Sequence, residues 1–347
     1  MRAERQIPVA AQEWSRTTTT RYNHEGLRSC QRSILFLKDC EHGKPPPKTA
    51  TWAALSTDND QLTTPHSTTM FAEQKLSDIP LVVLDTETTG LRPELGHRVV
   101  EVAAVRLENW QKVEEVSQLI NPERPMDPEA SKVNGIRDED LLGQPVFGLL
   151  QPRLMEIMDG ALLVAHNAAF DAGFLGMEFY IAGIHASPAT LPNPWLCTLQ
   201  LARRHFFFGR NNLGHIASKL GVRVGRAHRA LSDVYTTAAV LKEMARLLAQ
   251  RRLDTVGDLL HAQGGPIFAP PPPRFSLPAS IETAMVECRQ LNIIYLDQYQ
   301  RTERTITPLY PTQYEGVTYL VAFCHLRQAQ RTFRLDRIQS AEIRNGN

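Results

Sequence analysis

The chain has 347 residues, enough for two or three domains of ordinary size. Hydrophobic residues make up 42% and charged residues 22%, so the composition predicts a globular protein with room for a sizeable core. The net charge of +1 gives no overall attraction to nucleic acid, which would need a local basic patch. No apolar run approaches the roughly 18 residues of a membrane-spanning helix, and no membrane partner is expected. The five cysteines are scattered and form no C-x-x-C motif, so a cytoplasmic protein is expected.

Residues 1–78 differ in composition from the rest of the chain. Thr17 to Thr20 form a homopolymer, three prolines follow at 45–47, and Ser, Thr, Asp and Asn crowd positions 56–69. Such polar sequence buries too little apolar surface to fold, so a disordered extension is expected. Alternatively, the natural protein starts at Met70, just ahead of the first strong strand pattern, and mass spectrometry of the natural N-terminus would separate the two.

An α/β pattern runs over residues 79–262. Apolar runs and partial alternation predict strands at 81–84, 98–107, 113–120 and 161–165. Apolar positions at helical spacing predict helices at 147–158, 170–181, 213–220 and 230–248. Strands followed by alternating helices and strands are typical of an α/β sandwich.

Residues 263–279 are predicted to form a linker, which the run Pro270 to Pro273 stiffens. A second unit follows over residues 280–347. Its pattern predicts a helix at 281–288 and strands at 292–296, 305–309, 319–323 and 331–335. Short strands in so small a unit predict a small β-barrel.

Two carboxylates follow the first predicted strand. Asp85 and Glu87 are two residues apart, so their side chains point to the same face. Two negative charges held that close repel each other, and a hard divalent cation between them would offset the repulsion. An Asp-x-Glu pair alone is weak evidence, because a chain of this composition holds about one by chance.

Two further polar clusters lie at predicted helix starts. His166, Asn167 and Asp171 come where a strand ends and a helix begins, and His228 and Asp233 open the helix predicted at 230–248. Helix capping and complementation of the helix dipole are the alternative explanation for each cluster alone.

The three clusters together favour a site, because open α/β sheets build their sites at strand ends and helix starts. The four carboxylates of these clusters would surround two metal ions and support an in-line phosphoryl displacement. A neutral histidine could accept the proton of the attacking water, and His228 is the candidate.

The run Val83 to Leu91 (VLDTETTGL), then His166 to Asp171 (HNAAFD), then His228 with Asp233, resembles the three exonuclease motifs of the DnaQ-like DEDDh family. That family includes the proofreading subunit of bacterial replicative polymerase. The resemblance covers about residues 79–250. It implies a ribonuclease H-like fold with a mixed five-stranded sheet flanked by helices. It also implies Mg²⁺ or Mn²⁺, two per site, and stepwise 3′–5′ hydrolysis that releases nucleoside 5′-monophosphates.

The resemblance also implies residue roles. The implied metal ligands are Asp85, Glu87, Asp171 and Asp233, and the implied general base is His228. The residues implied to contact the terminal nucleotide are Thr88, Leu91, His166, Asn167 and Phe170. For Leu91 and Phe170, core packing is the alternative. Proofreading enzymes usually carry His where this chain has Asn134, a position outside the motifs where no effect on metal binding is expected.

Residues 280–347 resemble a WYL domain, a small Sm-like barrel of bacterial regulators. The matching segments are RTITPL from Arg304, Tyr319-Leu320, and RTFRLDRI from Arg331, although Thr318 replaces the Trp of the naming triplet. The resemblance implies a nucleic-acid or nucleotide ligand. The expected patch is Arg304, Tyr319, Arg331, Phe333, Arg334 and Arg337. Basic and aromatic side chains together suit a single strand, and a solvated sheet edge is the alternative.

The sequence therefore predicts a metal-dependent 3′–5′ exonuclease that acts on single-stranded or frayed DNA 3′ ends, in replication or repair. An exoribonuclease acting on RNA ends or oligoribonucleotides is one alternative, because nothing in the motifs contacts a 2′-hydroxyl. A polymerase accessory subunit is another. A regulatory protein that uses the nuclease fold as a platform is a third, although binding alone has no use for four clustered carboxylates.

Overall fold

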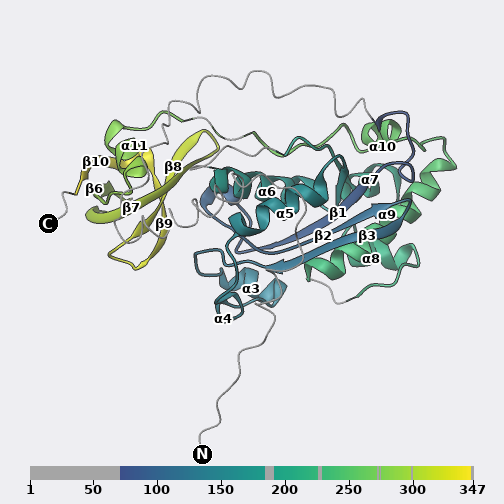
Figure 1. Ribbon diagram of the computed structural model, residues 1–347, viewed down its shortest axis with the longest axis horizontal. Helices are drawn as coiled ribbons and strands as arrows, with labels where there is room; N and C mark the ends of the chain where they lie inside the picture. Colours follow the sequence, from purple (N-terminus) through teal and green to yellow (C-terminus); the bar gives the residue numbers. More distant parts are fainter. Residues whose placement is uncertain are drawn as a thin grey trace, which may run out of the picture.

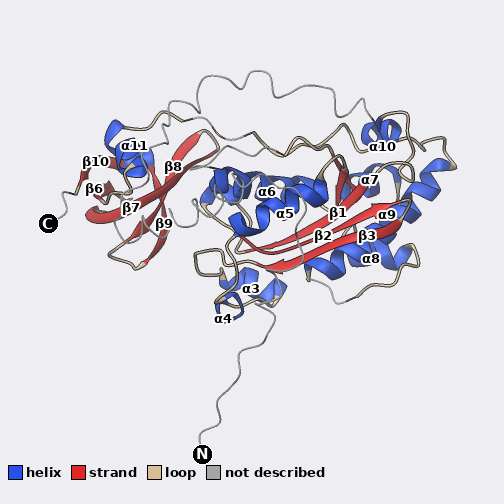
Figure 2. Cartoon of the chain, in the orientation of Figure 1, coloured by secondary structure: helices blue, strands red, loops and turns tan. Residues whose placement is uncertain are grey.

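The computed structural model describes residues 71–183, 191–225, 229–271, 273, 275–297 and 300–344. Most of the predicted N-terminal extension, with Met70, and the predicted general base His228 lie outside the described residues. The described chain forms two sheets with helices packed against them (Figures 1 and 2). In these described parts, no helix has the length and hydropathy needed to span a membrane.

The first sheet has five strands in the order β3-β2-β1-β4-β5. Their bounds are β1 Leu81–Thr88, β2 Val99–Glu108, β3 Gln111–Leu119, β4 Leu162–Ala165 and β5 Trp195–Cys197. Strand β2 is antiparallel to β1 and β3, whereas β4 is parallel to β1 and β5. The mixed five-stranded sheet predicted for the first unit is therefore confirmed.

Helices cover both faces of this sheet (Figure 2). They are α5 Phe147–Met158, α6 Ala168–Gly183, α7 Thr198–His205, α8 Leu213–Lys219, α9 Ala230–Ala249 and α10 Val256–Ala262. Short helices α3 Pro128–Asn134 and α4 Asp138–Leu141 follow β3, and the 3-10 turn η4 Pro93–Leu95 joins β1 to β2.

The two faces of β1 belong to two different apolar cores. Leu81 and Val83 pack in the core with α9, whereas Val82 and Leu84 pack in the core with α5 and α6. Burial on both faces explains why the start of β1 is a continuous apolar run. Since side chains alternate along a strand, the carboxylates that follow at odd positions face the α9 side.

The first unit extends beyond its predicted limits at both ends. Phe71 and Leu76, within the predicted extension, are buried in the core with α10. Ile267, within the predicted linker, accepts a hydrogen bond at its carbonyl from the first residue of β5 (2.8 Å) and packs on the core with α6. Residues 71–78 and 263–267 therefore pack as part of this unit, because their apolar side chains complete its two cores.

The second sheet is antiparallel, with the order β10-β6-β7-β8-β9. Helix α11 Ala279–Val286 precedes it, and the strands are β6 Leu291–Leu296, β7 Arg301–Tyr314, β8 Val317–Cys324, β9 Ala329–Arg334 and β10 Ile338–Ile343. Strand β7 has 14 residues and is much longer than predicted, although Pro308 and Pro311 lie within it. A register shift next to Pro308 accommodates the missing N–H donor. Because the described pairings run from β10 to β9, closure into the predicted barrel stays a prediction.

Candidate active site

Three carboxylates meet at the C-terminal end of β1. Asp85 and Glu87 come from β1, and Asp233 comes from the first turn of α9. One oxygen atom of each lies within 4.8 Å of the others. Helix α9 packs on the sheet face to which the two β1 carboxylates point, so its first turn reaches them. Asp85 and Glu87 therefore point to the same face of the sheet, as the alternation of side chains along a strand predicts.

Asp171 approaches β1 from the first turn of α6 and is only 3% exposed. Its Oδ1 accepts hydrogen bonds from the backbone N–H (3.0 Å) and the hydroxyl (2.8 Å) of Thr86. Thr86 stands between Asp85 and Glu87 and points to the opposite face, so it can fasten α6 to the strand that carries them. Asp171 lies close enough to Asp85 to be the largest charge acting on it.

Burial and mutual repulsion raise the pKa values of these carboxyl groups. Burial, followed by repulsion from Asp171, raises the pKa of Asp85 well above its usual 3.8. Burial, followed by repulsion from Glu101, raises the pKa of Glu87 from 4.5 to about 8. Burial raises the pKa of Asp171 from 3.8 to about 7. A divalent cation such as Mg²⁺ binds several negatively charged oxygen atoms. The clustered carboxylates supply such oxygens, so the residues present fit such an ion.

These shifts predict that the metal-free protein loses stability as the pH rises. Glu87 and Asp171 bind protons more tightly in the folded than in the unfolded chain, so their contribution is complete below about pH 4 and is lost as the pH rises through about 7 and about 8. We expect the melting temperature in EDTA to fall between about pH 5 and pH 8, and Mn²⁺ to restore it at the higher pH. Thermal denaturation of the wild type and of Glu87→Gln measures this. The variant lacks one titrating group and should show a smaller fall, so an equal fall would contradict the prediction.

Glu101 is a buried residue of the site that the sequence analysis did not single out. It lies opposite Glu87 in the β1–β2 register and is 3% exposed. Its carboxylate accepts hydrogen bonds from Nε (3.2 Å) and Nη2 (2.9 Å) of Arg229 and from the N–H of Ala230 (3.2 Å). Since Ala230 begins α9, Glu101 fixes the start of the helix that presents Asp233. A single acid within the apolar run of β2 was the available signal.

Asn134 lies beside the carboxylates of the site. It ends α3, is 5% exposed, and donates from Nδ2 to the carbonyl of Thr88 (3.3 Å). Its side chain also hydrogen bonds to Glu87, which offsets part of the rise in the pKa of Glu87 that burial causes. The amide is therefore a direct neighbour of a predicted metal ligand, and its expected lack of effect on metal binding stays a prediction.

His166 joins three segments around the site. Its Nε2 lies 2.9 Å from the carbonyl oxygen of Asn211 and its Nδ1 lies 2.9 Å from the hydroxyl of Thr198. A carbonyl only accepts, so Nε2 carries the proton and Nδ1 accepts from the hydroxyl. Burial lowers the pKa of His166, which favours this neutral ring. Both ring nitrogens thus hold the end of β4 against α7 and the chain before α8.

The other residues predicted to contact a terminal nucleotide differ in exposure. Leu91 is 77% exposed, which excludes core packing for it, and Asn167 is exposed in the turn before α6. Phe170 is half-buried, with its ring 4.8 Å from that of Phe174, so it packs partly on the core. Thr88 is buried and donates its hydroxyl to the Gly90 carbonyl (2.6 Å). The predicted base His228 lies outside the described residues.

The second sheet carries a cavity of about 280 Å³. Its lining residues are Tyr295, Asp297, Arg304, Cys324, Arg327, Arg331, Thr332 and Phe333. Three of the six predicted patch residues, Arg304, Arg331 and Phe333, are among them. Arg334 instead pairs with Asp336, with 2.7 Å between Nη2 and Oδ2. The cavity therefore gathers part of the predicted basic and aromatic patch, together with Arg327 from the same basic stretch of sequence.

Comparisons with known proteins follow the same division of the chain. A family model described as an exonuclease matches residues 82–241, and a model described as a WYL domain matches residues 277–343. The first match spans the strand and both helix starts that carry the clustered carboxylates. The second spans the whole of α11 and all five strands of the second sheet.

Similar proteins include polymerase subunits. DNA polymerase III subunit epsilon of Pasteurella multocida is 34% identical over 174 residues, which cover 47% of this chain and 67% of that protein. A DNA polymerase III subunit epsilon-like protein of Rhodobacter capsulatus is 34% identical over 194 residues, which cover 54% of this chain but only 27% of that protein. Among solved structures, exonuclease X in complex with 5′-overhanging duplex DNA is 27% identical, with a TM-score of 0.40, and the match covers 53% of this chain and 99% of that chain.

Proposed function

The chain belongs to the family of DnaQ-like exonucleases and carries a WYL domain, and from this premise we propose that it is a metal-dependent 3′–5′ exonuclease acting on single-stranded or frayed DNA ends. The observation that carries the proposal is the cluster of three carboxylates, Asp85, Glu87 and Asp233, in which one oxygen of each lies within 4.8 Å of the others. A purely structural role does not account for it, because acids that share a partly buried corner destabilise a fold unless a cation neutralises them.

The proposed ligands of Mg²⁺ or Mn²⁺, two ions per site, are Asp85, Glu87, Asp171 and Asp233. When bound, the ions supply Lewis-acid activation of water and neutralise charge on the reacting phosphate. Hydrogen bonds set the ligand directions in advance. Thr86 holds Asp171, and Glu101 holds the start of the helix that presents Asp233.

His228 is the proposed general base. It would accept a proton from the attacking water while the water oxygen forms a bond to the phosphorus of the last phosphodiester. The bond from phosphorus to the 3′ oxygen breaks, so a nucleoside 5′-monophosphate leaves and the shortened strand ends in a 3′-hydroxyl. Arg229, the next residue, is anchored by two hydrogen bonds to Glu101.

The terminal nucleotide is proposed to bind beside β1. Leu91 would contact its base, because this side chain is exposed directly after the carboxylate strand. Thr88 would contribute backbone groups, since its hydroxyl is already bonded within the chain. The residues proposed to line the pocket beside them are His166, Asn167 and Phe170.

Strand degradation tests the proposed function. A 5′-labelled single-stranded DNA and an RNA of the same sequence are incubated with Mg²⁺, with Mn²⁺ or with EDTA. We expect DNA ladders that shorten from the 3′ end with either ion, and none in EDTA. Faster degradation of RNA would move the substrate class to RNA ends. Binding without degradation under every condition would overturn the enzyme proposal in favour of a regulatory platform.

We further propose that the second sheet closes as a small barrel and binds single-stranded nucleic acid or a nucleotide at its cavity. Arg304 and Arg331 would contact phosphate. Phe333, predicted to stack on a base, is only 5% exposed, and its ring centre lies 5.2 Å from that of Tyr295, so it packs in the core beneath the cavity. Arg331→Gln should weaken DNA binding measured by fluorescence anisotropy in EDTA. Arg301→Gln, which changes an exposed arginine outside the cavity lining, is the matched control. If both variants bound DNA with the same affinity as the wild type, the cavity would be excluded as the binding site.

Partner and location are proposed from the relatives and the composition. The Pasteurella multocida protein is named as a polymerase subunit. We therefore propose that this chain associates with a DNA polymerase in the cytoplasm. Co-purification of the tagged full chain with a polymerase tests the association, and its absence at native expression levels would contradict it.

A further inference from the structure

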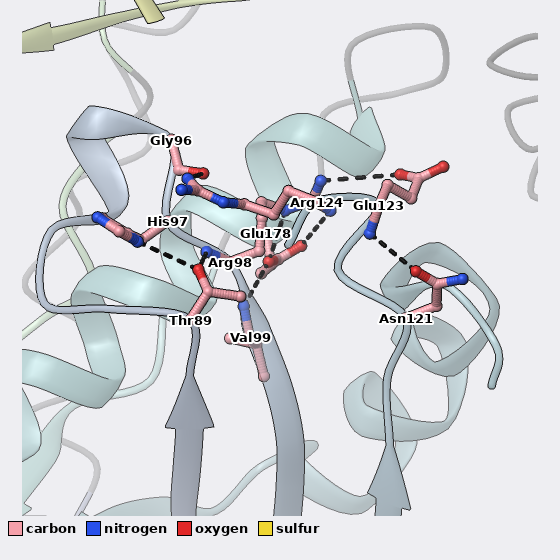
Figure 3. A network of polar contacts seen from close by, with 9 residues as sticks. All are labelled: Thr89, Gly96, His97, Arg98, Val99, Asn121, Glu123, Arg124 and Glu178. Atoms are coloured by element: carbon pink, nitrogen blue, oxygen red, sulfur yellow. Dashed lines mark hydrogen bonds and ion pairs between the residues drawn. The ribbon is translucent and has the colours of Figure 1, made fainter. Parts of the chain in front are cut away.

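The loop between β1 and β2, residues 89–98, connects the proposed site with the second sheet. It begins directly after Thr88 and carries the exposed Leu91. On its inner side the two ends of the loop are tied together. The N–H of Thr89 donates to the carbonyl of Arg98 (2.8 Å), and the N–H of Arg98 donates to the hydroxyl of Thr89 (3.0 Å; Figure 3).

A buried ion pair fixes the end of this loop to α6. Nε and Nη2 of Arg98 each donate to one carboxylate oxygen of Glu178, both at 2.8 Å, and Glu178 also accepts from the N–H of Val99 (2.9 Å; Figure 3). Burial alone would lower the pKa of Arg98, but the adjacent carboxylate outweighs burial and raises it, so the pair is ionised. Glu178 follows Asp171 by seven residues and so lies on the same side of the helix.

The second sheet contacts the outer side of the same loop. The hydroxyl of Thr332 in β9 donates to the carbonyl of Leu95 in η4 (2.9 Å). The guanidinium of Arg92 lies 5.1 Å from the ring centre of Tyr314 in β7. Gly96 has φ +84°, and a Cβ atom placed there would lie 3.1 Å from the hydroxyl oxygen of Thr332. The loop backbone and the second sheet are therefore closely fitted.

The second sheet is also fixed to α6. Ile181 near the end of α6 forms a buried apolar cluster with Tyr310 of β7 and Val321 of β8. The hydroxyl of Tyr180 donates to the carbonyl of Pro311 (3.4 Å). One helix thus carries Asp171 in its first turn, the partner of the loop arginine further along, and the docking surface of the second sheet at its end.

We propose that Thr332 is a positioning residue of the exonuclease site. By holding the carbonyl of Leu95, it keeps the loop in the conformation in which Leu91 and the backbone of Thr88 meet the terminal nucleotide. Because the loop is already ordered before the substrate binds, binding loses less conformational entropy. This inference rests on the proposed function. It adds that the second unit shapes the nuclease site itself and is more than a separate binding surface.

Thr332→Val tests the inference, because valine keeps the shape of threonine and loses the hydroxyl. We expect KM for single-stranded DNA to rise by about 3- to 10-fold, the effect of one hydrogen bond, with little change in kcat. Thr332→Ser retains the hydroxyl and should restore the wild-type KM. An unchanged KM in the valine variant, or an equal rise in both variants, would overturn the role of the hydroxyl.

Hydrogen–deuterium exchange of the free proteins gives a readout that needs no activity. Amides of residues 91–97 should exchange faster in Thr332→Val than in the wild type or in Thr332→Ser. Arg301→Gln changes an exposed arginine outside the cavity lining and should leave this exchange unchanged. If the wild type degrades no strand, the proposed function fails while exchange still decides the role of Thr332. If the wild type is active and Thr332→Val matches it in KM and exchange, only the positioning role fails.

Discussion

Asp85→Asn is expected to lower kcat for DNA degradation by at least about a thousandfold. The amide keeps the volume of the side chain but removes the negative charge and one of the oxygen donors that a divalent cation needs. The same change removes one of several mutually repelling carboxylates. The metal-free variant should therefore melt at a higher temperature than the metal-free wild type. Lost activity with gained stability is the signature of a metal ligand.

Single-turnover degradation of a 5′-labelled strand measures the first effect, and thermal denaturation in EDTA measures the second. Asp159→Asn is the matched control, because Asp159 is exposed at the end of α5 and outside the cluster. The control should match the wild type in both measurements. If Asp85→Asn degraded DNA at the wild-type rate, Asp85 would have no role in the reaction. An inactive variant with a lowered melting temperature would assign it to the fold instead.

Glu178→Gln is expected to lower the free energy of unfolding by about 3–5 kcal/mol. The substitution leaves the guanidinium of Arg98 buried without its main counter-charge. Glutamine retains one oxygen acceptor for the N–H of Val99, so the loss reflects the charge more than the backbone hydrogen bond. Glu123, 3.7 Å from Arg98, gives partial compensation and favours the lower end of the range.

A double variant separates the lost charge from lost packing. Arg98→Met combined with Glu178→Leu replaces both charged side chains by apolar ones of similar length and should recover much of the stability. Urea denaturation of the wild type, the single variant and the double variant gives the three free energies. A single variant as stable as the wild type would contradict the importance of this pair, and a double variant no better than the single one would assign the loss to packing.

Predictions from the sequence were most accurate for features that depend on a single strand or helix. Asp85 and Glu87 share a face because side chains alternate along any strand. Helix α5 has the predicted bounds because its apolar positions follow helical spacing. By contrast, β5 has three residues, too few to show any periodicity, and it was missed together with α7 after it.

Contacts between distant segments could not be predicted in this way. Charged side chains usually lie at the surface, so nothing in the pattern indicated that Arg98 and Glu178 would be buried together. Thr332 and Leu95 are 237 residues apart, and only the docking of the second sheet brings them into contact. The long strand β7 contains two prolines, which local propensity counts against a strand.

The docking of the second sheet on α6 affects the use of shortened forms of the chain. A fragment that stops at the proline-rich stretch would present Met177, Tyr180 and Ile181 to water, and exposed apolar side chains of this kind promote self-association. The same cut would leave the carbonyl of Leu95 without its donor. Low exonuclease activity of such a fragment would therefore have three causes that the measured rate cannot separate: aggregation, a relaxed loop and a lost binding surface. Single-residue changes in the intact chain keep the three effects apart.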